Sequence, residues 1–176
     1  MKKALLILAA LIVALGLTVF IAGSFMPREH VATSTIVIPA PADTVWATIR
    51  DFQALPTWWS DVERIEPLDD SAGREVWMHH MSSGALGIAV ERDEAPSILV
   101  TRMLADANAA FGGIWTYRLA REGDATRVTI IEAGYINNKV FRFLAGTVMG
   151  MHGSMDSYLT ALARHFGSDR LPEHML

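Results

Sequence analysis

The chain has 176 residues, of which 51% are hydrophobic and 19% are charged, and its formal net charge is −4. A domain of this size can bury enough apolar surface to be stable without covalent cross-links. The absence of cysteine excludes disulfide bonds, thiolate catalysis and cysteine-ligated metals. The acidic balance argues against a nucleic-acid partner, because binding phosphates requires a basic face.

The excess of hydrophobic residues is concentrated at the N-terminus. Residues 4–23 carry no charge. As a helix rising about 1.5 Å per residue, this run would be roughly 30 Å long, the thickness of the hydrocarbon core of a bilayer. Lys2 and Lys3 precede the run and only Arg28 closely follows it. The positive-inside rule therefore predicts a single-pass anchor with a cytoplasmic N-terminus and an extracytoplasmic domain.

A cleaved signal peptide is the alternative interpretation of the same segment. Lys2 and Lys3 form a short basic start, and small residues at 22–24 offer a cleavage site that would release a secreted form. The apolar part of a signal peptide is usually about 7 to 15 residues long, which is shorter than this run. We therefore favour an uncleaved anchor over residues 1–26, followed by a linker over 27–32.

One strand and one helix are predicted after the linker. Residues 33–39, TSTIVIP, form a run rich in β-branched side chains, which favours a strand. Pro41 and Asp43 are favourable at a helix start, and apolar residues recur at helical spacing over 43–52.

Two adjacent tryptophans follow, in LPTWWSD at 55–61. Pro56 limits any helix here to a turn or two, so Trp58 and Trp59 are expected in a short turn. A structural plug, a membrane-dipping tip and part of a binding site are three interpretations that this stretch alone leaves open.

The hydrophobic period then changes to two, which indicates strands with one dry and one wet face. Turn residues such as DDSAG and EGD separate the runs, which predicts an antiparallel meander. The predicted strands span residues 62–68, 74–81, 86–92, 98–104, 114–120 and 127–133.

The last predicted element is a long amphipathic helix over residues 138–166. Gly146, Gly150 and Gly153 each cost about 1 kcal/mol relative to alanine, so we expect a bend near them. Polar side chains form one face, at Lys139, Arg142, Ser157, Thr160 and Arg164. The buried face is predicted to hold Phe141, Leu144, Val148, Met151, His152, Met155, Leu159, Leu162 and Phe166.

Three segments carry a resemblance to a known family: STIVIPAPADTVWATIRDF (34–52), ALPTWWSDVERIE (54–66) and MDSYLTALARHF (155–166). They resemble the first strand and opening helix, the tryptophan-bearing turn and the closing helix of the START and Bet v 1-like superfamily (SRPBCC). The match is to its polyketide cyclase/dehydrase and lipid-transport branch, and it covers roughly residues 31–168.

The resemblance implies an α+β helix-grip fold, in which a curved antiparallel sheet of about seven strands wraps around a long C-terminal helix, here with an added N-terminal transmembrane helix. We place this domain at residues 33–168 and a C-terminal tail at 169–176.

In this family an apolar ligand lies between the sheet and the helix. The short helical turn forms part of the entrance in this family, so the resemblance implies that one of Trp58 and Trp59 lies at the cavity mouth and the other closes the turn against the core. The expected ligand-binding residues are Trp58, Trp59, Trp77, His79, Met81, Met103, Trp115, Tyr117, Phe141, His152 and Met155.

Catalytic and metal-binding patterns are weak. MHGSMDS (151–157) contains His152, Ser154 and Asp156, but on a helix Ser154 points away from His152, and a GxSxG motif is absent. A His152–Asp156 hydrogen bond is the simpler interpretation. His79 and His80 project to opposite faces of a strand, so one metal could not easily use both.

Two charges lie inside otherwise apolar strands. We interpret Arg102 and Glu132 as solvated side chains on the convex face of the sheet. If they pointed inward they would have to be paired, because a lone buried charge is very costly.

We therefore predict a membrane-anchored domain that binds a hydrophobic small molecule or lipid, without cofactor, metal or catalytic residues. The alternatives are a cyclase, dehydratase or hydrolase acting on an apolar substrate, and an accessory protein that contacts other envelope proteins. An enzyme would need convergent titratable groups in the cavity, and a carrier would need volume and an entrance. Neither the ligand nor the oligomeric state follows from the sequence.

Overall fold

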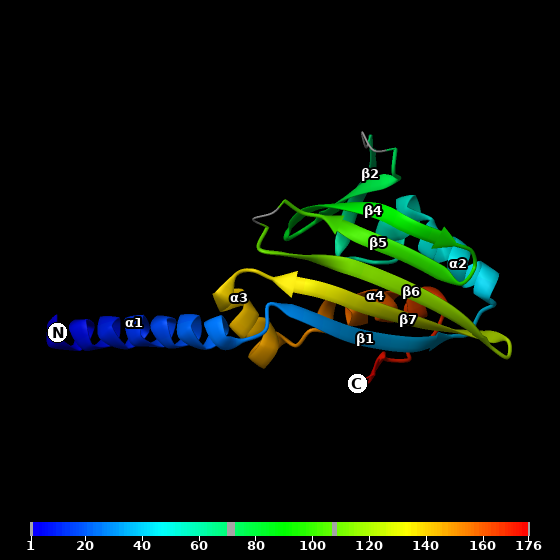
Figure 1. Ribbon diagram of the computed structural model, residues 1–176. Helices are drawn as coiled ribbons and strands as arrows, with labels where there is room; N and C mark the ends of the chain where they lie inside the picture. Colours follow the sequence, from blue (N-terminus) through cyan, green and yellow to red (C-terminus); the bar gives the residue numbers. More distant parts are fainter. Residues whose placement is uncertain (1, 70–72, 107–108, 176) are drawn as a thin grey trace.

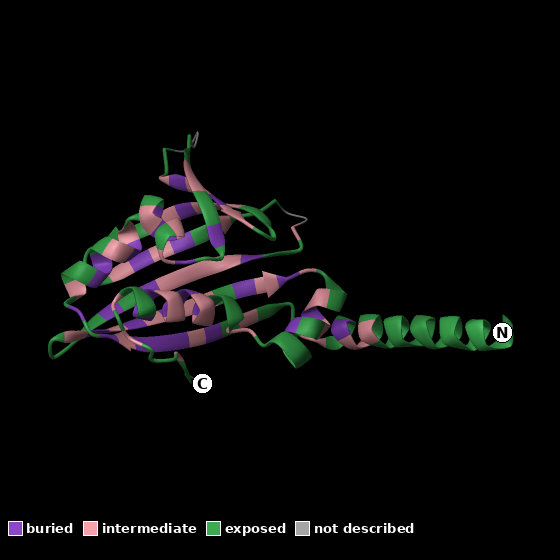
Figure 2. Cartoon of the chain, turned by 180° about the vertical axis from the view of Figure 1, so that it is seen from behind, coloured by how far each residue is buried: buried purple, intermediate pink, exposed green. Residues whose placement is uncertain are grey.

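The computed structural model describes residues 2–69, 73–106 and 109–175. Helix α1 (Lys2–Phe25) projects from one end of an α+β domain (Figure 1). Its side chains are exposed along most of its length (Figure 2). In the described part of the chain, α1 is the one helix whose length and composition would allow it to cross a membrane.

The domain is built on one antiparallel sheet with the strand order β2-β3-β4-β5-β6-β7-β1-β8. Strands β2 to β7 form a meander, and β1 returns beside β7, with Ile36 opposite Val128. The strands are β1 (Glu29–Ile38), β2 (Val62–Leu68), β3 (Val76–Met81), β4 (Gly84–Glu94), β5 (Ile98–Leu104), β6 (Phe111–Glu122), β7 (Ala125–Ile136) and β8 (Glu173–Met175).

Helices cover the concave face of this sheet (Figure 1). Met155, Leu159 and Leu162 on α4 are fully buried, as the predicted apolar face requires. The helices are α2 (Ala42–Arg50), the 3-10 helix η1 (Phe52–Thr57), α3 (Lys139–Leu144), the π-helical turn η2 (Ala145–Met149) and α4 (Gly153–His165). The predicted helix-grip architecture is confirmed.

The C-terminal helix differs from the single helix predicted over residues 138–166. It is divided into α3, η2 and α4, and Gly150 between η2 and α4 has a φ of 76°. That left-handed conformation favours glycine and ends the helix. As a result Val148, expected on the buried face, is 75% exposed. The break falls where the glycines predicted a bend.

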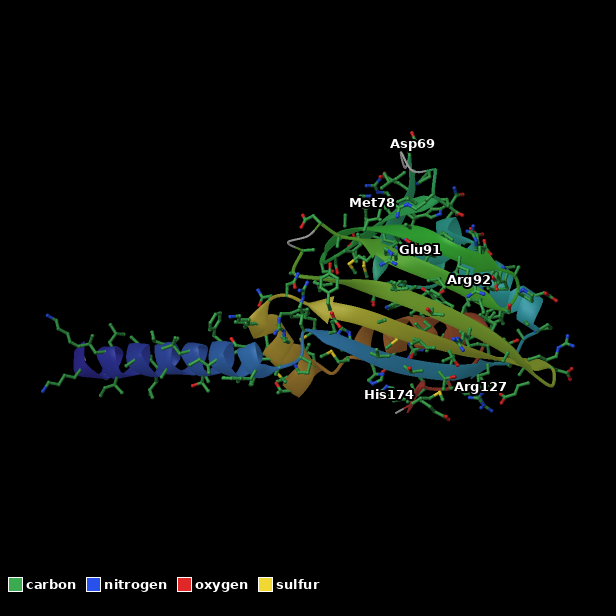
Figure 3. The ribbon with its side chains drawn as sticks, in the orientation of Figure 1. Asp69, Met78, Glu91, Arg92, Arg127 and His174 are labelled. Atoms are coloured by element: carbon green, nitrogen blue, oxygen red, sulfur yellow. The ribbon has the colours of Figure 1, made fainter. Side chains whose placement is uncertain are left out.

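The sheet has one strand more than expected. Strand β8 lies in the segment predicted as a tail and pairs with β1, placing Met175 opposite Thr33. His174, labelled in Figure 3, lies on this edge strand. Its Nε2 atom is 2.8 Å from a carboxylate oxygen of Asp156, and its ring stacks on His152 at 3.8 Å between centroids. These contacts hold the C-terminus against the sheet.

Strand β1 also starts earlier than the strand predicted at 33–39. It begins at Glu29, so residues predicted as a linker pair with β7, as His30 does opposite Gly134. Only a short connection therefore separates α1 from the sheet.

Arg142 was predicted on the polar side of the last helix, and that prediction is wrong. It is 9% exposed, and its guanidinium group donates hydrogen bonds to backbone carbonyls near the end of α1 and after β7. The burial arises because α1 packs against α3, a contact that helical periodicity does not reveal.

Candidate functional site

A cavity of about 460 Å³ lies between the concave face of the sheet and the helices. This volume lies within the range of roughly 300–1,000 Å³ typical of small-molecule sites. The wall is predominantly apolar. Much of it is formed by Phe52, Leu55, Trp59, Ile88, Met103, Trp115, Tyr117, Phe141, Met149, Met151 and Tyr158.

The structure brings seven of the expected ligand-binding residues together in the cavity wall: Trp59, His79, Met81, Met103, Trp115, Tyr117 and Phe141. The other four, which are Trp58, Trp77, His152 and Met155, are not among the lining residues. Contact between these residues and a ligand stays a prediction.

The two adjacent tryptophans take different positions. Trp59 is 7% exposed, and its indole N–H donates to the Ser157 hydroxyl at 3.0 Å. The ring of Tyr158 lies between the pair, edge-on to both, at 5.1 Å from Trp59 and 5.2 Å from Trp58. Trp58 is half-buried and also lies near His165 on the outer side. Trp59 is thus the tryptophan of the turn that reaches the cavity.

Other contacts explain why Trp77 and Met155 are outside the cavity wall. Trp77 donates its indole N–H to the Glu75 carboxylate at 2.7 Å and packs beside Phe52. Met155 is fully buried in the core.

His152 and Asp156 do not form a catalytic triad with Ser154. Instead, the buried Ser34 hydroxyl donates to Asp156 at 2.8 Å and lies 3.2 Å from Nδ1 of His152. Ser154 lines the cavity, whereas His152 does not. Together with His174, these side chains connect β1, α4 and β8. The direct His152–Asp156 hydrogen bond expected from the sequence is replaced by contacts of both residues with the Ser34 hydroxyl.

A carboxylate–imidazole pair lies in the cavity wall. The Glu132 carboxylate accepts the indole N–H of Trp115 at 2.8 Å, and its other oxygen lies 3.0 Å from Nε2 of His30. His30 and Glu132 both line the cavity and are largely buried. This corrects the interpretation of Glu132 as a convex-face charge. Arg102, by contrast, is exposed as predicted and pairs with Glu91.

Strand parity could have placed Glu132 and His30 on the inner face of the sheet, although it does not pair them. Glu132 shares a strand face with the buried Val128 and Ile130, and His30 shares one with Ala32. Gly134 lies opposite His30 on the neighbouring strand and leaves space for its imidazole ring, because a Cβ atom at Gly134 would lie 2.7 Å from that ring.

The family model described as "Polyketide cyclase / dehydrase and lipid transport" matches residues 29–167, from the first residue of β1 to just beyond α4. The chain belongs to this family. A comparison with curated proteins gave no match.

Solved structures of the same fold are similar over nearly all of the domain. A START superfamily protein from Mycobacterium smegmatis is 18% identical, with a TM-score of 0.62 over 78% of this chain and 97% of that one. The ZhuI aromatase/cyclase from Streptomyces sp. R1128 is 17% identical, with a TM-score of 0.61 over 79% and 94%. A hypothetical protein from Helicobacter pylori is 13% identical, with a TM-score of 0.63 over 77% and 87%. At these identities the likeness establishes the fold.

Within this polyketide cyclase-like cavity, several polar groups are held neutral. Burial lowers the pKa of His79 to about 4, so its imidazole is uncharged at neutral pH. Burial also raises the pKa values of Tyr117 and Tyr158. Among the described residues, no cluster of three or more metal-ligating side chains is found.

Proposed function

We propose that this member of the polyketide cyclase / dehydrase and lipid transport family is a membrane-anchored domain that binds a hydrophobic small molecule or lipid. The apolar cavity of about 460 Å³ is the observation that carries the proposal. A packed core leaves few voids larger than a water molecule, so a cavity of this size suits a bound molecule. Most of its wall can offer a ligand only apolar contact.

The anchoring part of the proposal rests on α1. Its apolar side chains are exposed, with Leu5 at 70% and Leu15 at 66%, which is unfavourable in water and favourable in a bilayer. The charge bias of Lys2 and Lys3 supports an orientation with the domain outside the cytoplasm.

Native mass spectrometry of the full chain, released from detergent micelles, tests the binding proposal. We expect a retained apolar mass, or retention of added cis-parinaric acid. A double variant, Ile88→Trp with Met103→Trp, should abolish retention, because these paired positions of β4 and β5 both line the cavity. Leu104→Trp is the matched control, since Leu104 is 38% exposed and outside the cavity wall. Equal retention by all three proteins would contradict the proposal.

The paired Glu132 and His30 favour a second candidate, an enzyme that acts on an apolar substrate in the same cavity. A carboxylate beside an imidazole can exchange a proton with a bound substrate by general acid–base catalysis. Conversion of a retained ligand by the wild type and not by Glu132→Gln would establish this function in place of simple binding.

A further inference from the structure

The end of α1 is packed against α3, at the end of the sheet from which α1 projects (Figure 1). A Cβ atom at Gly23 would lie 2.0 Å from the Lys139 carbonyl oxygen, so only glycine permits this approach. The Lys139 ammonium group lies 4.6 Å from the ring centroid of Phe20. A lysine beside the end of an apolar span is well placed at a membrane interface.

Arg142 fixes this arrangement. Its guanidinium group donates to the carbonyl oxygens of Met26 at 3.1 Å and Gly23 at 3.4 Å. It also donates to those of Ile136 at 3.0 Å and Asn137 at 3.3 Å. A buried charge is tolerated when its donors are satisfied in this way. Because one side chain joins α1, α3 and the end of β7, the domain is held in a set orientation relative to α1.

The segment formed by α3 and η2, residues 139–149, exposes apolar side chains beside α1. The exposed fractions are 41% for Val140, 37% for Leu144, 75% for Val148 and 61% for Met149. Phe25, the last residue of α1, is 87% exposed. Since the 20-residue apolar run of α1 ends at Gly23, this apolar surface lies at the level where the hydrocarbon core of a bilayer would end.

The same segment also lines the cavity. Phe141, Ala145 and Met149 belong to the cavity wall, and Gly150 and Met151 continue it. A single layer of chain thus separates the apolar surface beside α1 from the cavity.

The backbone of this layer is irregular. Residues 145–149 form a π-helical turn, and Gly150 follows with a φ of 76°. π-helical turns are often found at functional sites, and segments outside regular helices open at lower cost than a packed core does.

We propose that the 139–149 segment rests in the membrane surface and acts as a gate, through which an apolar ligand passes directly between the bilayer and the cavity. This inference rests on the proposed function. The occupant of the apolar surface is membrane lipid, because the surface is continuous with the apolar surface of α1. The ligand class that follows is a molecule dissolved in the membrane, which need not cross water to reach the cavity.

The position of the segment can be measured with single cysteines, since the chain has none of its own. Val148→Cys is labelled with a nitrobenzoxadiazole dye in the full chain, reconstituted in phosphatidylcholine–phosphatidylglycerol vesicles. Asp124→Cys, in the exposed turn between β6 and β7 at the opposite end of the sheet (Figure 1), is the control. Doxyl-labelled lipid should quench the dye at 148 and leave the dye at 124 unaffected. Equal quenching at both positions would overturn the membrane contact.

The gate itself is tested by the rate at which cis-parinaric acid moves from the same vesicles into the protein, measured by energy transfer from tryptophan. Val148→Asp should slow this transfer by about tenfold, because a charged side chain is expelled from the interface. Leu171→Asp, at a position that is 73% exposed and away from the segment, should leave the rate unchanged. Both variants should bind the probe in detergent with wild-type affinity.

The outcomes separate the gate from the proposed function. Unchanged transfer by Val148→Asp, with binding in detergent intact, would overturn the gate and leave the binding function standing. If the wild type binds the probe neither in detergent nor in vesicles, both the gate and the proposed binding function are overturned.

Discussion

Glu132 accepts the indole N–H of Trp115 at 2.8 Å in the wall of a mainly apolar cavity. A carboxylate offers about four acceptor positions, and Trp115 and His30 occupy one each. A ligand with a hydroxyl group could use a remaining position. Glu132 therefore gives an otherwise apolar cavity one group that can distinguish a ligand with a hydroxyl group from one without.

We expect Glu132→Gln to reduce the preference of the protein for 1-hexadecanol over hexadecane. A hydrogen bond to a charged group contributes roughly 1.5–3 kcal/mol, so the preference should fall by about tenfold or more. Competition with cis-parinaric acid in the full chain measures both affinities. Ser83→Ala, which alters another polar residue of the wall, is the control. The same preference in Glu132→Gln and the wild type would rule out Glu132 as the discriminating group.

His79 predicts a pH dependence of stability. Burial lowers its folded-state pKa from 6.5 to about 4, so the unfolded chain binds more protons between these values. Stability from this group is therefore complete above about pH 6.5 and falls as the pH drops toward about 4, by roughly 3 kcal/mol in all.

Urea unfolding of the full chain in detergent at pH 7 and pH 4.5 measures this effect. His79→Phe should remove most of that loss, because it has no group to protonate. The neighbouring His80→Gln should retain the loss, since His80 lies on the other face of β3 and pairs with Glu66. An unchanged pH dependence in His79→Phe would show that other groups cause it.

The buried face of α4 gives a direct stability prediction. Leu159 is fully buried, so Leu159→Asp would leave a charge without a partner in the core and should unfold the domain. Arg164→Asp introduces the same charge at an exposed position and should cost no more than about 1 kcal/mol, from the helix dipole. Circular dichroism melting curves compare the two. Similar melting temperatures would contradict the packing of α4 on the sheet.

Ser157 shows why a control chosen from helical periodicity alone would have been unsuitable. The pattern places it on the polar face of the last helix, yet its hydroxyl accepts from Trp59 and donates to Asp61 at 2.6 Å. An aspartate there would face the Asp61 carboxylate, so substitution would not be neutral.

Alternation and turn residues were sufficient to predict most of the sheet. The strands predicted at 62–68 and 98–104 have the same limits as β2 and β5, because local β-branched and alternating patterns determine them. Strand β8 could not be predicted, since it is three residues long and depends on distant contacts of His174.

The candidate site likewise has features that local patterns predict and features that depend on distant contacts. Aromatic and methionine residues such as Trp115 and Met103 could be assigned to the cavity from strand parity and the family resemblance. The burial of Arg142 follows from the position of α1 beside α3, and the pairing of Glu132 with His30 follows from the register of β1 on β7. These relationships depend on tertiary structure, which local periodicity does not specify.

The two adjacent tryptophans should respond differently to a ligand. Trp59 lines the cavity and is fixed by its hydrogen bond to Ser157, whereas Trp58 lies on the outer side of Tyr158. Trp59→Phe removes that bond and part of the wall, so it should weaken binding of cis-parinaric acid by at least about fivefold. Trp58→Phe should change the affinity by less than about twofold, since it removes no cavity wall. Both variants retain an aromatic ring, which limits the disturbance of packing. Their melting temperatures identify any loss of binding that is caused by unfolding. Weaker binding in Trp58→Phe with no effect of Trp59→Phe would place the ligand on the opposite side of Tyr158.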